Sequence, residues 1–148
     1  MLTDLLLAIV HHLLVFILFA ILAVELVWMK RELTREGLPR LARLDMIFGI
    51  VAGLVLVAGF ARVFYGAKGY EYYFASHSFW TKIAAFAAIA LLSIYPTLKI
   101  IAWSRRAKRE PHFVPPAAEI RRARLVMHIE ATIFILIPIF AAAMARGY

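Results

Sequence analysis

Cysteine is absent from this sequence of 148 residues. Its absence excludes disulfide bonds, thiolate metal sites and cysteine nucleophiles. The sequence also lacks a nucleophile with a base at the spacing that hydrolytic catalysis needs, so hydrolases are poorly supported. Acidic residues are few, at 9 against 17 lysines and arginines. Any chemistry therefore depends on a small number of histidines, carboxylates and cations.

Apolar residues make up 64% of the chain, and its mean hydropathy is +0.83. A soluble domain of this length cannot bury so much apolar surface, so we expect lipid to be the solvent. Four apolar runs, residues 5–29, 45–65, 79–98 and 125–144, are each long enough to cross roughly 30 Å of hydrocarbon. The first run is too long for a signal peptide and has no basic residues before it. The sequence therefore predicts an all-α integral membrane protein, a single domain over residues 1–148 folded as an up-down bundle of four transmembrane helices.

The net charge of +8 is concentrated in two segments. Residues 30–43 hold five lysines and arginines, residues 99–124 hold eight, and the rest of the chain holds four. Basic residues next to apolar runs mark the cytoplasmic side of a membrane protein, so this distribution argues against nucleic-acid binding. It predicts a multi-pass protein of the bacterial inner membrane with both termini outside. The aromatic-rich segment 66–80 would then lie in the outer headgroup layer.

Prolines predict where one helix ends, and glycines predict which face of a span packs on another helix. Pro111, Pro115 and Pro116 should interrupt the basic extension after the third span. Glycines in the second span, Gly49 and Gly53, predict a face that another helix approaches closely. The alanine-rich span 79–98 is the expected partner, which would make the second and third spans the tightly packed centre of the bundle.

Ionisable side chains inside the spans are the functional candidates, because a bilayer penalises each by a few kcal/mol. One set lies toward the outer side: His11, His12, Arg62 and Lys82. A histidine beneath two cations suits haem b, with imidazole on the iron and the cations on the propionates. His77 in the external segment is a candidate second ligand. Alternatively, the two cations only reach toward headgroups.

Adjacent helical residues point about 100° apart, so at most one of the two neighbouring histidines is well placed as a ligand. His11 shares a face with Glu25, and His12 shares one with Ala8 and Ala23, which are small enough for close packing. The choice stays open, with a slight preference for His12 as the tentative iron ligand.

A second set of ionisable side chains lies toward the inner side, and its members are Glu25, Asp45, His128 and Glu130. Such carboxylates can carry protons or bind a cation. Alternatively, Glu25 and Asp45 pair with basic residues of the connections such as Lys30, Arg43 or Arg124. His128 and Glu130 lie about 200° apart on a helix and cannot both face one site, and His128 is the preferred inward residue.

The segment Phe79-Trp80-Thr81-Lys82 follows a loop containing Gly66, Lys68 and Gly69 and precedes Leu92-Ser93-Ile94-Tyr95-Pro96-Thr97. In these features nearly the whole chain resembles an uncharacterised family of small bacterial four-helix membrane proteins. More distantly it resembles the HemJ-type protoporphyrinogen oxidases and the CopD-type copper-resistance membrane proteins. The HemJ resemblance implies a b-type haem and oxidation of a porphyrinogen, with the early histidine matching His11 or His12 and the lysine matching Lys82. Thr81 departs from the histidine-containing segment that HemJ-type proteins normally have there.

Three functions remain open from the sequence. The first is a haem- or porphyrin-binding oxidoreductase that acts on a porphyrin or quinone. The second is proton- or cation-coupled transport without a cofactor. The third is an accessory role in a homo-oligomer or a larger membrane complex.

Overall fold

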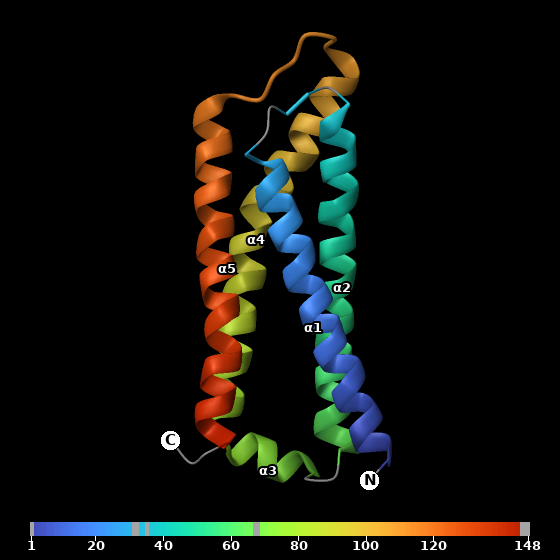
Figure 1. Ribbon diagram of the computed structural model, residues 1–148, viewed down its shortest axis with the longest axis vertical. Helices are drawn as coiled ribbons and strands as arrows, with labels where there is room; N and C mark the ends of the chain where they lie inside the picture. The colour runs from blue at the N-terminus through green and yellow to red at the C-terminus, as the bar shows by residue number, and fades with distance from the viewer. Residues whose placement is uncertain (1, 31–32, 35, 67–68, 146–148) are drawn as a thin grey trace.

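The computed structural model consists of five α-helices, shown in Figure 1. Their bounds are α1 Leu2–Trp28, α2 Gly37–Tyr65, α3 Gly69–Ala75, α4 His77–Arg109 and α5 Ala117–Ala145. The structure describes residues 2–30, 33–34, 36–66 and 69–145, without the side chains of 140–141 and 143–145. Lys68, which contributes to the family resemblance, lies outside the described residues.

Among the described residues, three helices are long and apolar enough to cross a membrane: α1, α2 and α4. The fourth predicted span lies on α5, which runs beside α4 for most of its length (Figure 1). The all-α class is confirmed, whereas the count of four spans remains a prediction. The helices α2, α4 and α5 extend beyond the predicted spans into the basic segments, because lysine and arginine are good helix formers outside lipid.

The four long helices form two pairs, α1 with α2 and α4 with α5 (Figure 1). We call the end that holds the connections 29–36 and 110–116 the basic end. At the opposite end, which we call the aromatic end, α3 lies across the bundle between the end of α2 and the start of α4. The helix α1 begins and α5 ends at this same aromatic end, as an up-down arrangement requires.

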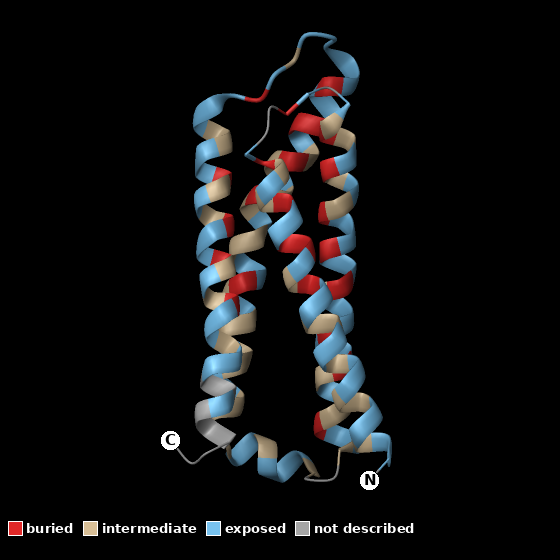
Figure 2. Ribbon diagram, in the orientation of Figure 1, coloured by how far each residue is buried: buried red, intermediate tan, exposed pale blue. Residues whose placement is uncertain are grey.

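Burial is concentrated toward the basic end, as Figure 2 shows. The buried residues of α1 begin only at Leu18, and those of α4 begin only at Ile89. Toward the basic end the two helix pairs share one core, which includes Leu38, Ile100 and Trp103. Toward the aromatic end the pairs diverge in Figure 1, and few of their residues there are buried.

The predicted close packing of α2 on α4 is wrong. Gly49 and Gly53 are exposed, and a Cβ atom added to either would meet nothing within 4 Å. The closest neighbour of α2 is instead α1, which approaches Gly59. Glycines can lie on a lipid-facing surface as well as at a helix contact, so their spacing alone does not identify the contact face.

The predicted interruption after α4 is confirmed, because α4 ends at Arg109 and α5 begins at Ala117. Pro111, Pro115 and Pro116 occupy this connection, where proline cannot continue the hydrogen-bonded helix. Arg106 lies 4.4 Å from the centroid of the Phe113 ring, which holds the connection against α4.

Glu119 in the first turn of α5 joins α5 to α4. Its carboxylate accepts a hydrogen bond from Trp103 Nε1 at 2.9 Å and pairs with Lys99 Nζ at 2.9 Å. Hydrogen bonds from Lys99 and Trp103 hold the pKa of Glu119 below its ordinary value of 4.5. Because the charged form is favoured in the folded protein, this contact stabilises the fold above that value and is lost as the pH falls through the lowered pKa.

We therefore expect Glu119→Gln to flatten the pH dependence of stability on the acidic side. Wild-type protein in detergent should lose melting temperature as the pH falls below the ordinary glutamate range, and the variant should lose less. Glu71→Gln, at an exposed position on α3, is the matched control and should follow the wild type. Identical profiles for wild type and Glu119→Gln would contradict the assignment.

The segment 66–80, predicted as an aromatic external connection, folds in part into α3. Trp80 Nε1 donates a hydrogen bond to the Phe74 carbonyl at 3.0 Å, and the two rings are stacked with centroids 6.0 Å apart. Phe79 packs against both of these rings. The aromatic side chains thus fold α3 back onto the start of α4, near the beginning of the span that carries Lys82.

Candidate functional site

Three basic side chains from three helices come together near the aromatic end. His11 lies on α1, Arg62 in the last turn of α2 and Lys82 near the start of α4. Both Arg62 and Lys82 act electrostatically on His11, and Arg62 also acts on Lys82. All three are half-buried. We call these three residues the basic cluster.

His11 occupies the contact between α1 and α2. Its Cε1 atom lies 3.3 Å from the position that a Cβ atom on Gly59 would take, so the missing side chain leaves room for the imidazole ring. Its Nδ1 atom is buried 3.6 Å from the same position, and the backbone of Val55 on α2 acts on the imidazole as a hydrogen-bonding group. The half-buried imidazole beside two cations is the strongest indication of a ligand at the basic cluster.

The preference for His12 as the inward residue is wrong. His12 is exposed, and its Nδ1 atom lies 2.6 Å from the Ala8 carbonyl oxygen on its own helix. The buried face of α1 is the one that carries Leu18, Leu22 and Glu25, and His11 shares that face. The sequence signal for this face is the relation of His11 to Glu25, fourteen positions on, although the sequence alone did not decide between the two histidines.

The basic cluster has little compensating negative charge. Asp4 Oδ1 lies close to Gly66 at the end of α2, 2.9 Å from the position of an added Cβ atom. Among the described residues, however, neither Arg62 nor Lys82 forms an ion pair. The Nε atom of Arg62 is buried without a partner. Clustered cations in a half-buried position favour an anionic guest.

The basic cluster fits the donor set that a haem requires, an imidazole nitrogen for the iron and cations for the propionates. His77 is not brought into it. That residue begins α4 with an exposed side chain, and it is not among the groups that act electrostatically on His11. The cluster thus offers one imidazole, from His11, and two cations.

The three carboxyl residues of the inner set form, together with a threonine, a polar layer in the half of the bundle nearer the basic end. Its members come one from each long helix and are Glu25, Asp45, Thr97 and Glu130. Thr97 Oγ1 donates a hydrogen bond to Asp45 Oδ1 at 2.8 Å, and the three carboxyl groups act electrostatically on one another. We call these four residues the polar layer.

The preference for His128 over Glu130 is also wrong. Glu130 is only 1% exposed, whereas His128 is exposed and its Nδ1 atom lies 2.7 Å from the Arg124 carbonyl oxygen. The two residues do point apart as their spacing predicts. The face of α5 that packs inward carries Ala123, Met127, Glu130 and Phe134, so it is the carboxylate that enters the core.

The alternative in which basic residues of the connections neutralise the buried carboxylates is not what the structure contains. Among the described residues, the ion pairs are Lys99 with Glu119 and Arg106 with Glu110. Oε1 of Glu25 and Oε1 of Glu130 are buried and have no hydrogen-bond partner. The polar layer therefore lacks a cation in the described part of the chain.

Helices of membrane-spanning length, with ionisable groups turned into the bundle, define an α-helical membrane protein. A family model described as a predicted membrane protein, DUF2214, matches residues 3–148, and the chain belongs to this family. No curated protein and no solved structure matches the chain significantly. The membrane class is therefore established, and the activity has to be argued from the two clusters.

The contact between His11 and Gly59 makes a testable prediction. Gly59→Leu should destabilise the protein by about 1–3 kcal/mol, since a larger side chain forces the imidazole and α1 away from α2. Gly53→Leu is the matched control on the same helix, and it should change stability by less than about 0.5 kcal/mol because that position is open. Thermal unfolding in detergent measures both. Equal effects at the two positions would show that α1 does not pack on Gly59.

Proposed function

We propose that this protein is a membrane redox protein that binds haem b or a related porphyrin at the basic cluster. The observation that carries the proposal is the half-buried imidazole of His11, on which the two cations Arg62 and Lys82 act. When bound, haem iron would supply one-electron chemistry. The His11 imidazole would provide the axial ligand.

The two cations support the same ligand. Arg62 on α2 and Lys82 on α4 would bind the carboxylate arms of a porphyrin, and they come from different helix pairs. A guest held by both would join the pairs where they diverge. The distant resemblance to HemJ-type proteins is in line with this proposal, because their early histidine matches His11 or His12 and their lysine matches Lys82.

Haem titration into the purified protein tests the role of His11. We expect a Soret band in the wild type that is lost in His11→Ala. His12→Ala is the matched control, and it should keep the band because His12 is exposed and bonds to a carbonyl oxygen of its own helix. Retention of the band in His11→Ala with loss in His12→Ala would refute the assignment of the ligand. Failure of every form to bind haem would refute the proposed function.

The cations are tested by comparing haem with haem dimethyl ester, whose propionates carry no charge. Arg62→Gln and Lys82→Gln should each weaken haem binding by about tenfold or more, since a hydrogen bond to a charged group contributes roughly 1.5–3 kcal/mol. Binding of the ester should be the same in wild type and variants. Equal weakening for both ligands would mean that the cations only maintain the fold.

We further propose that the basic end faces the bacterial cytoplasm, because lysine and arginine accumulate on that side of inner-membrane proteins. The absence of cysteine makes labelling of single introduced cysteines unambiguous. A membrane-impermeant maleimide added to spheroplasts should modify Glu71→Cys on α3. It should modify Arg109→Cys, at the end of α4, only after permeabilisation. The reverse pattern would invert the orientation.

A further inference from the structure

The carboxyl groups of the polar layer are not used by the proposed haem site. Glu25 is 2% exposed, Asp45 6% and Glu130 1%. The hydroxyl of Thr97 donates a hydrogen bond to one carboxylate oxygen of Asp45. By contrast, Oε1 of Glu25 and Oε1 of Glu130 have no hydrogen-bond partner. Buried carboxylate oxygens without partners are costly, so a group that satisfies them has to be identified.

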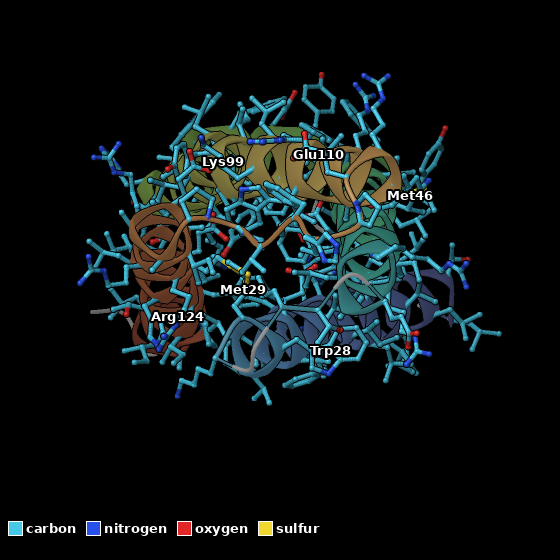
Figure 3. All side chains as sticks on the ribbon, turned by 90° about the horizontal axis from the view of Figure 1, so that it is seen from above. Trp28, Met29, Met46, Lys99, Glu110 and Arg124 are labelled. Atoms are coloured by element: carbon cyan, nitrogen blue, oxygen red, sulfur yellow. The ribbon has the colours of Figure 1, made fainter. Side chains whose placement is uncertain are left out.

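Apolar side chains enclose the polar layer on both sides. One helical turn toward the basic end are Met29, Leu41, Ile100 and Met127, each at most 1% exposed. Seen from that end, Met29 projects into the space between the four helices (Figure 3). One turn toward the aromatic end are Leu22, Phe48 and Phe134, at 1%, 5% and 6% exposed. The carboxyl groups therefore lie in surroundings of low polarity, where charge is strongly disfavoured.

The charged groups around the layer do not compensate it. The titratable groups that act on Glu25 are Asp45 on α2 and Glu130 on α5, and Asp45 also acts on Glu130. From α4 the layer receives the neutral hydroxyl of Thr97, while Lys99 pairs with Glu119. On α5, His128 is exposed and Arg124 lies one and a half turns toward the basic end. Among the described residues, the charged groups that act on the polar layer are therefore its own carboxyl groups, and no cation offsets their negative charge.

These observations favour the proton as the cation that occupies the layer. Among the described residues, no three histidine or acidic side chains are grouped so that they could hold a metal ion. A proton needs only one carboxylate oxygen, and interacting carboxyl groups bind protons as a coupled set. We propose that Glu25, Asp45 and Glu130 form a proton-exchange site within the membrane, which takes up protons from water on the side of the basic end and returns them there. Each step forms or breaks one O–H bond on a carboxylate, without a redox change.

The positions of Glu25 and Asp45 along their helices indicate the end of the bundle from which protons reach the polar layer. Glu25 lies three residues before the basic end of α1, and Asp45 lies eight residues after the start of α2. The far ends of these helices are more than twice as distant from the same residues. Met29 in the apolar layer is flexible and unbranched, and its side chain would have to move for water to reach Glu25.

Infrared difference spectroscopy of the wild-type protein in liposomes tests the proposal without haem. We expect a carbonyl band of protonated carboxyl groups that changes reversibly between mildly acidic and mildly alkaline pH. Glutamate labelled with ¹³C at the side-chain carboxyl should shift most of this band, which assigns it to glutamate without any substitution. A band that is absent, or that does not respond to pH, would overturn the proposal and indicate a fixed polar layer.

Substitutions identify the residues that give rise to the infrared carbonyl band. Glu25→Gln and Glu130→Gln should each remove part of it, and Glu71→Gln on α3 is the matched control that should leave it unchanged. Retention of the full band in both buried variants would place the titrating groups elsewhere and overturn the proposal. This infrared measurement uses the protein without haem. A negative result here therefore does not bear on the proposed haem site, and a negative haem titration does not bear on the proton-exchange site.

Discussion

The cost of an ionisable side chain in hydrocarbon is the constraint on which this structure depends. Each such residue of the apolar helices must reach the surface, turn into the bundle or find a partner. His12 and His128 bond to carbonyl oxygens of their own helices on the exposed side. His11 and Glu25 turn inward instead. The rotation of α1 about its own axis therefore places His11 and Glu25 on the side that packs against the other helices.

The same constraint divides the protein into two halves. Near the basic end the four long helices share a core that contains the polar layer, and large apolar residues such as Trp103 and Phe48 complete it. Near the aromatic end the helix pairs diverge, and the basic cluster draws its residues from both pairs. Within the apolar helices, the buried carboxyl groups thus lie in one half of the bundle and the cations of the basic cluster in the other.

Separation of the two clusters has a chemical consequence. Cations and carboxylates that met in the core would neutralise each other as buried ion pairs, which contribute little net stability. Kept apart, the two clusters suit the two partners proposed for them, an anion at the basic cluster and protons at the polar layer. The proposed redox group in one half and the proposed proton site in the other would suit a protein whose electron transfer and proton uptake occur at different depths.

The amino-acid sequence by itself determined the helical class, the interruption at Pro111, Pro115 and Pro116, and the end of the bundle toward which each set of ionisable residues lies, because hydropathy and proline geometry act locally. Only the tertiary structure decided which face of each helix turns inward. Neighbours such as His11 and His12 differ by rotation alone, and the contacts that set this rotation come from other helices. For the same reason Glu130 enters the core in place of His128, and Gly59, not Gly49 or Gly53, meets α1.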